Sequence, residues 1–207
     1  MIKPNFYSIC SYADYEKIFK EKGYAYFTRG EYNLNIIGVR SDNKNKVTNL
    51  YDDLLVVVYK TPTGRWQRVT YPITTEPGLY YMTKGQMNPK GTAILVPGQY
   101  RGCWQLGLHK GKYKALVQRK DIKVYRDGNK DDIYDMSPTK IDKGIFGVNI
   151  HRSNEFVKST YINNYSAGCQ VFADPHDFKR FIALCEKQKQ LYGNTFTYTL
   201  LDESDLR

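Results

Sequence analysis

The stretch Asp53-Leu54-Leu55-Val56-Val57-Val58-Tyr59-Lys60 contains the longest unbroken apolar run of the sequence. Six apolar residues are far fewer than the ~20 that a membrane-spanning helix needs, and valine favours strands. The turn residues Thr61-Pro62-Thr63-Gly64 follow, and the strand-like stretch Trp66–Tyr71 comes next. We therefore expect a buried strand that turns into a second one as a β-hairpin.

The composition extends this prediction to the whole chain. The 207 residues are 41% hydrophobic and 25% charged, which suits an ordinary globular chain with a sizeable core and excludes a mainly disordered one. Nineteen Tyr and nine Phe favour strands, so we expect a mainly β, β-rich α+β protein. Without an internal repeat or a long linker, residues 1–207 are predicted to form a single domain, with residues 1–30 as an N-terminal lid segment.

Two helices are predicted near the ends of the chain. Tyr12–Lys22 has apolar residues at helical spacing and stops before Gly23, so it should cover the sheet. Asp174 and Pro175 provide an N-cap and a first-turn proline for a second helix that ends at Gly193. Further strand-like stretches, expected to form a mostly antiparallel meander, are Tyr32–Val39, Tyr113–Gln118, Ile122–Tyr125 and Thr195–Leu201.

Positive charge is concentrated in one part of the sequence. The net charge is +10, and Arg101–Lys130 holds nine basic and two acidic residues. Such a basic strip can contact nucleic acid, an anionic lipid surface or an anionic polymer such as a bacterial cell wall, or it can be a solvated strand face. No Walker loop, zinc-finger spacing or RNP-like motif supports specific nucleic-acid binding.

The cysteines and histidines argue against disulfides and metals. Cys10, Cys103, Cys169 and Cys185 allow three patterns of two disulfides, but they are widely spaced. Met1–Tyr7 shows no export signal, which predicts synthesis in the cytoplasm and free thiols. With no Cys-x-x-Cys and only three histidines, we expect neither a metal site nor a cofactor.

Two segments carry candidate chemistry. Ile145–His151 alternates so that Asn149 and His151 face the same polar side, and Ser166-Ala167-Gly168-Cys169 forms a turn before a strand. The glycine lets the backbone turn sharply, which presents the thiol and leaves N–H groups for an oxyanion. A histidine on a neighbouring strand can act as base and lower the thiol pKa. Alone, each residue is more simply explained by packing or surface exposure than by catalysis.

These residues resemble the signature of the L,D-transpeptidase (YkuD-like) catalytic domain family, a histidine followed by a loop and Ser/Thr-His-Gly-Cys. Eighteen positions separate His151 from Cys169, and Asn88–Thr92 is similar to the family's Thr-Pro-x-Gly-x strand. The resemblance implies a β-sandwich with a short N-terminal helix and a C-terminal helix followed by a strand. It also implies Cys169 as nucleophile, His151 as base, and the N–H groups of Gly168 and Cys169 as oxyanion hole.

This sequence departs from the family at several positions. Ala167 stands in place of the second histidine, Arg152 in place of a small residue, and Val171 near the usual arginine. The pattern resembles a variant common among phage-encoded proteins. We expect Asn149 or a backbone carbonyl to orient the imidazole of His151. Stem-peptide contacts are expected from Arg152, Ser166, Tyr100 and Arg101.

The function that the resemblance implies is acyl transfer on peptidoglycan stem peptides through a thioester acyl-enzyme. If water attacks the acyl-enzyme, the protein is an endolysin-like hydrolase, which is the outcome we favour. If an amine attacks it, the protein is a cross-linking transpeptidase. A protein without a leader reaches the wall through a holin or inside a virion. The alternative from another class is a non-catalytic wall-binding or virion structural protein that retains the fold. Neither a membrane span nor a cofactor is expected.

Overall fold

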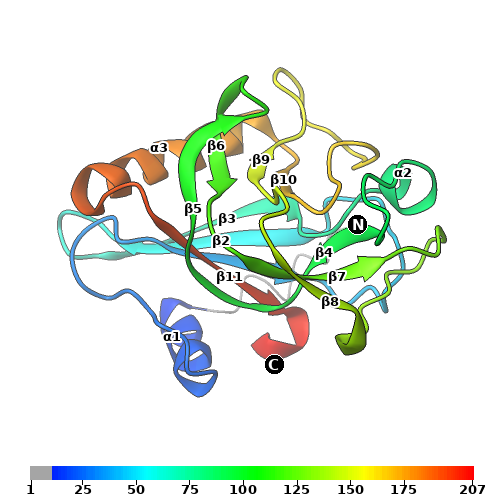
Figure 1. The fold of residues 1–207 in the computed structure, drawn as a ribbon. Helices are drawn as coiled ribbons and strands as arrows, with labels where there is room; N and C mark the ends of the chain where they lie inside the picture. The colour runs from blue at the N-terminus through cyan, green and yellow to red at the C-terminus, as the bar shows by residue number, and fades with distance from the viewer. Residues whose placement is uncertain (1–10) are drawn as a thin grey trace.

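The computed structural model describes residues 11–207 and consists mainly of β-strands (Figure 1). Eight strands form a closed barrel in the order β1-β11-β5-β6-β9-β10-β3-β2, and β4, β7 and β8 form a separate sheet. The barrel strands are β1 (Asn35–Arg40), β2 (Asp53–Lys60), β3 (Trp66–Thr74), β5 (Gly98–His109), β6 (Tyr113–Gln118), β9 (Ile150–Arg152), β10 (Gln170–Phe172) and β11 (Phe196–Asp202). The second sheet contains β4 (Thr92–Leu95), β7 (Ile122–Asp127) and β8 (Ile141–Gly144). The mainly β prediction is confirmed, whereas the sandwich arrangement stays a prediction.

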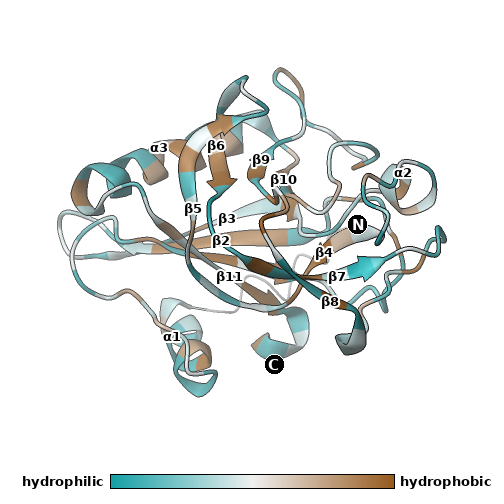
Figure 2. Ribbon diagram, in the orientation of Figure 1, coloured by the Kyte–Doolittle hydropathy of each residue, from teal (hydrophilic) through white to brown (hydrophobic). Residues whose placement is uncertain are grey.

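The β2–β3 hairpin has the predicted position, and its burial explains the apolar run. β2 and β3 pair antiparallel from Asp53 opposite Ile73 to Lys60 opposite Trp66. Alternate residues of β2 point to opposite faces, and both faces are covered. Leu55 and Val57 lie in the core inside the barrel, while Leu54, Val56 and Val58 pack in a second cluster outside it. Figure 2 accordingly shows β2 as a hydrophobic strand.

The two predicted long helices are confirmed and cover different parts of the barrel. α1 (Tyr12–Glu21) begins with a capping box between Ser11 and Asp14, and it buries Tyr15 and Phe19 in the outer cluster. α3 (Pro175–Tyr192) starts at Asp174, whose side chain accepts the His176 N–H at 2.8 Å. Its apolar face, formed by Phe178, Phe181 and Cys185, joins the inner core. Residues 1–10 of the expected lid segment lie outside the described residues.

Three shorter helical segments complete the fold: α2 (Leu79–Thr83), η1 (Pro138–Lys140) and η2 (Glu203–Leu206). Most strand pairs are antiparallel, as predicted, but β1 pairs with β11 and β9 with β10 in parallel. The second parallel pair places His151 opposite Val171. This register brings the two candidate segments of the sequence together. Within residues 11–207, no helix is long and apolar enough to cross a bilayer.

Candidate active site

Cys169 lies directly before β10, beside the entry to β9. The Gln170 N–H donates to the Asn149 carbonyl at 2.9 Å, which fixes the start of the parallel pair. The Asn149 N–H points at the Cys169 sulfur at 3.4 Å, and the thiol donates to the Gly147 carbonyl at 3.5 Å. Backbone groups of the segment that leads into β9 therefore hold the thiol from two directions.

Gly168 and Ser166 build the turn that presents Cys169. Gly168 has φ +114°, and a Cβ at this position would lie 2.3 Å from the Ala93 carbonyl oxygen, so only glycine fits. The fully buried Ser166 hydroxyl donates to the Cys169 carbonyl at 2.8 Å and accepts the Gly168 N–H at 3.2 Å. Ser166 thus supports the loop, and it is not among the residues that line the neighbouring cavity. The Gly168 N–H, expected in an oxyanion hole, is occupied by Ser166.

His151 is oriented by a backbone carbonyl, one of the two acceptors that the sequence left open. Its Nδ1 lies 2.8 Å from the Arg152 carbonyl oxygen, and the Tyr113 hydroxyl lies 3.2 Å from the same nitrogen and donates to the same carbonyl. A carbonyl only accepts, so Nδ1 carries the hydrogen in this contact. The neutral ring then keeps its lone pair on Nε2, which is the nitrogen available as a base.

His109, at the end of β5, is a site residue that the sequence analysis missed. Its ring stacks on that of His151, with centroids 4.0 Å apart and an interplanar angle of 22°. The Asn149 side-chain amide lies 3.1 Å from His109 Nδ1, so Asn149 positions His109 and not His151 as expected. The pairings of β5 with β6 and of β6 with β9 bring His109 here. The only available signal was that the chain has just three histidines.

Burial sets the protonation of the site. It lowers the pKa of His151 to about 3, with the neighbouring His109 adding to the effect, and it lowers the pKa of His109 to about 4. Burial also raises the pKa of the Cys169 thiol, against a smaller lowering by the Asn149 N–H. The net direction of the Cys169 pKa is therefore opposite to the one expected from a pairing with His151. At neutral pH the resting site holds a thiol and two neutral imidazoles.

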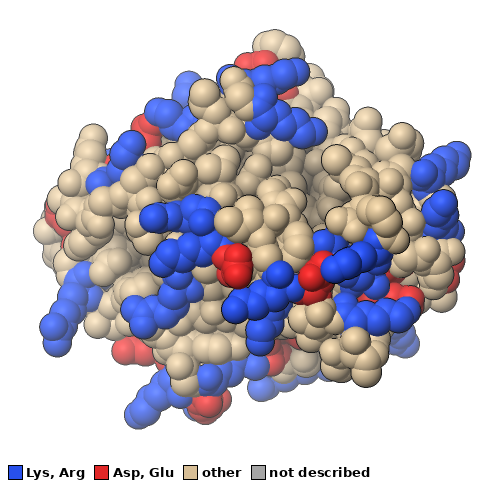
Figure 3. Space-filling model, in the orientation of Figure 1, with Lys and Arg blue, Asp and Glu red and all other residues tan. Residues whose placement is uncertain are grey.

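Cys169, His151 and His109 line one cavity of about 530 Å³. The molecular surface is hollowed between the elements labelled β9 and α2 (Figures 1 and 3). Apolar and aromatic side chains form much of the wall, and they include Tyr81, Met87, Ala93, Ile145, Phe146 and Tyr165. Lys110 and Arg126 add positive charge, although Arg126 is paired with Asp142 at 3.2 Å. The cavity has the size and the largely apolar lining with a few polar groups that are typical of a ligand site.

The cavity lining does not include the other predicted substrate contacts. The Arg152 guanidinium lies 3.9 Å from the centroid of the Tyr113 ring and 3.1 Å from Glu155, so this residue serves the site through its carbonyl. The Tyr100 hydroxyl is in the core and donates to the Val96 carbonyl at 2.6 Å. Arg101 is exposed on β5, outside the cavity. The structure does not bring these three side chains together with Cys169.

The basic strip of Arg101–Lys130 lies largely on the surface. Its lysines and arginines are exposed except for Arg126, which is 7% exposed. Strand register adds Lys143 of β8 directly opposite Lys123 of β7. Figure 3 shows Lys and Arg side chains gathered over β5, β7 and β8, with few acidic ones between them. This face is suited to an anionic partner.

Within residues 11–207 the structure shows neither a disulfide nor a cluster of metal-ligating side chains. Cys103, Cys169 and Cys185 are free, as predicted, while Cys10 lies outside the described residues. In the same range, no group of three or more His, Cys, Asp and Glu side chains is placed to hold a metal ion.

Comparison with known proteins identifies no relative. No family model matches the chain, and neither the curated proteins nor the solved structures contain a match. The features of the chain that bear on its function are therefore the geometry around Cys169 and the short motif that contains it.

Proposed function

We propose that this protein is a cysteine-dependent acyl-transfer enzyme that acts on peptidoglycan stem peptides, chiefly as a hydrolase. One observation carries the proposal: Cys169 and His151 line the same cavity, and the Arg152 carbonyl holds Nδ1 of His151 so that Nε2 remains a base. A nucleophile beside an oriented base is the arrangement that covalent acyl transfer requires. The peptidoglycan substrate, and the sandwich arrangement of the L,D-transpeptidase family, come from the motif resemblance.

In the proposed reaction the neutral His151 acts as a general base. Because the resting thiol is protonated, Nε2 of His151 takes its proton as Sγ of Cys169 attacks a peptide carbonyl carbon. The C–N bond then breaks, the amine leaves with the proton from His151, and a thioester remains on Cys169. His151 next removes a proton from water, the hydroxide attacks the thioester, and the sulfur leaves as the thiol when the proton returns.

The acceptor in the second step determines the outcome. Water releases a carboxylic acid and cleaves the wall, whereas an amine forms a cross-link. We favour hydrolysis because the motif resembles the phage-encoded variant. The exposed basic face would hold the enzyme on the anionic wall after holin-dependent release or from a virion.

A carbapenem and purified sacculi test the proposal. The wild-type protein should gain the mass of one carbapenem on Cys169 and release stem-peptide fragments that mass spectrometry identifies. Cys169→Ala should abolish both results, with at least a thousandfold loss of turnover and an unchanged circular dichroism spectrum. Cys103→Ser is the matched control, because Cys103 lies outside the cavity lining, and it should retain both activities.

A second candidate function is non-catalytic wall binding by the retained fold. The raised pKa of the Cys169 thiol favours it, since a protonated thiol is a poor nucleophile. Binding to sacculi with neither carbapenem labelling nor fragment release would support this alternative and exclude the enzyme.

A further inference from the structure

The proposed reaction uses one imidazole, but the cavity contains two. His109 and His151 are 6% and 4% exposed, and their rings are stacked. Each ring has its Nδ1 bound to a protein group: His109 to the Asn149 amide and His151 to the Arg152 carbonyl. In the part of the chain that the structure describes, no protein group is hydrogen-bonded to Nε2 of either ring. Both Nε2 atoms therefore remain for a ligand or for water in the cavity.

The hydrogen bonds of Asn149 fix the tautomer of His109. The Gln118 backbone N–H donates to Asn149 Oδ1 at 2.9 Å, which identifies the oxygen end of the amide. The other end, Nδ2, is a donor and lies 3.1 Å from His109 Nδ1. Nδ1 must therefore accept, and the hydrogen of the neutral ring is on Nε2.

The two stacked rings therefore have opposite tautomers. His151 carries its hydrogen on Nδ1 and has a basic Nε2, whereas His109 has an Nε2–H donor. Burial keeps both rings neutral, and the neighbouring Lys110 further disfavours a charge on His109. A neutral donor beside a base is suited to binding a carbonyl oxygen while the base handles the proton of the nucleophile.

We propose that His109 is a substrate-binding residue of this site, whose Nε2–H donates to a carbonyl oxygen of the peptide while its ring holds the plane of His151. The identity of the ligand rests on the proposed acyl-transfer function. The tautomer of His109 rests only on the hydrogen bonds of Asn149. The tautomer of His109 and its hydrogen bond to the ligand can therefore be tested separately.

Nitrogen NMR of the full-length, ¹⁵N-labelled wild-type protein tests the tautomers at pH 7. His109 should show a protonated Nε2 and His151 a protonated Nδ1, with His176→Gln used to assign the third histidine. Asn149→Ala should release His109 into a mixture of tautomers and leave His151 in its own. A protonated Nδ1 on His109 of the wild-type protein would overturn the inference.

Acylation by a carbapenem tests the donor. His109→Phe keeps a ring against His151 but removes the N–H, so the acylation rate should fall by about 10- to 100-fold. Alkylation of Cys169 by iodoacetamide should change by less than about threefold, because it depends mainly on the state of the thiol. His176→Phe, at an exposed position of α3, is the matched control and should match the wild type in both reactions.

The outcomes separate the inference from the proposed function. Equal acylation rates in the wild type and His109→Phe would overturn the donor role. Equal losses in acylation and alkylation would reduce His109 to a structural support. If the carbapenem fails to acylate even the wild type, the proposed function is contradicted, and the NMR tautomers still decide whether His109 presents a donor to the cavity.

Discussion

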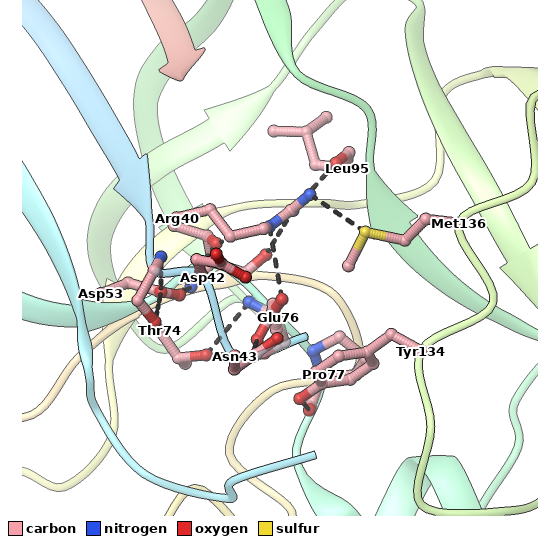
Figure 4. Close-up of polar contacts among 12 residues, drawn as sticks. Arg40, Asp42, Asn43, Asp53, Thr74, Glu76, Pro77, Leu95, Tyr134 and Met136 are labelled. Atoms are coloured by element: carbon pink, nitrogen blue, oxygen red, sulfur yellow. Dashed lines mark hydrogen bonds and ion pairs between the residues drawn. The ribbon is translucent and has the colours of Figure 1, made fainter. Parts of the chain in front are cut away.

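Within residues 11–207, two groups of polar side chains, one fully buried and one beside a cavity, are organised differently. One surrounds Arg40, Asp53 and Glu76, near the ends of β1 to β3 (Figure 4). The Arg40 guanidinium donates to the Leu95 carbonyl at 2.9 Å and lies 3.5 Å from Glu76, while Asp53 accepts the Thr75 N–H at 2.6 Å. Most groups in this cluster are therefore satisfied by one another and by the backbone, although Oε1 of Glu76 has the Arg40 guanidinium nearby but no hydrogen bond.

The other group is formed by Cys169, His151 and His109. Protein partners hold one side of each of these residues, and the other side contributes to the cavity wall. The comparison shows that burial of ionisable groups does not by itself mark a functional site. What distinguishes the second group is its chemistry: a thiol and two neutral imidazoles with unbound Nε2 atoms line one cavity, whereas Arg40 and Glu76 beside their own cavity form an ion pair.

Arg40→Leu is expected to have the largest effect on stability. It removes a buried cation and leaves Glu76 and Asp53 without their opposite charge, which should lower the free energy of unfolding by about 3–5 kcal/mol. Urea unfolding measures the change. Arg101→Leu, at an exposed position, is the control and should stay within about 0.5 kcal/mol. A loss below about 1 kcal/mol for Arg40→Leu would show that the cluster does not depend on this charge.

The pH dependence of stability should have opposite signs in the two groups. The folded pKa of His151, about 3, lies below the unfolded value of ~6.5, so its stabilising contribution is present above pH 6.5 and is lost as the pH falls. Burial and Asp53 raise the pKa of Glu76, so its contribution is present below the unfolded value and is lost as the pH rises.

Variants with a non-titrating side chain separate these contributions. Relative to the wild type, His151→Phe should gain stability by up to about 1.4 kcal/mol for each pH unit below 6.5, and Glu76→Gln should gain as the pH rises above ~4.5. Urea unfolding between pH 4 and pH 8 measures both. If the free energy of unfolding changes with pH in the same way in the wild type and in both variants, the assigned protonation states are contradicted.

A smaller effect is expected from Cys185→Ser. Cys185 is fully buried in the apolar core, where a hydroxyl should cost about 1–3 kcal/mol. Cys103→Ser should cost less than about 1 kcal/mol, because the Cys103 sulfur already lies 3.6 Å from the Arg101 and Asp121 carbonyls, which a hydroxyl can use as acceptors. Thermal unfolding measures both variants. If both substitutions lower the stability equally, the Arg101 and Asp121 carbonyls do not stabilise a hydroxyl at position 103.

The smallest expected effect is that of His151→Ala on the reactivity of the thiol. Since burial raises the pKa of Cys169 and His151 is neutral, alkylation by iodoacetamide should rise about tenfold per pH unit between pH 6 and pH 8. His151→Ala should alter the rate at pH 7 by less than about threefold. If the alkylation rate of the wild type is instead constant between pH 6 and pH 8, and His151→Ala removes this plateau, the site contains a thiolate–imidazolium pair.

Local sequence determined the elements and the candidate nucleophile. The apolar run of β2, the capping residues Ser11 and Asp174, and the Gly168 turn before Cys169 act through neighbouring residues, so their effects are visible in the sequence. The mainly β character followed from the same patterns. Strand alternation also placed Asn149 and His151 on one polar face.

Only the tertiary structure decided how these parts meet. The closed order of the barrel depends on pairing between distant strands, and this pairing stacks His109 on His151 and gives Asn149 a partner different from the expected one. Burial, which reverses the expected direction of the Cys169 pKa, is likewise a property of the packed molecule. A sequence pattern specifies the faces of an element, but the neighbours of each face follow from strand register and from the dielectric environment created by packing.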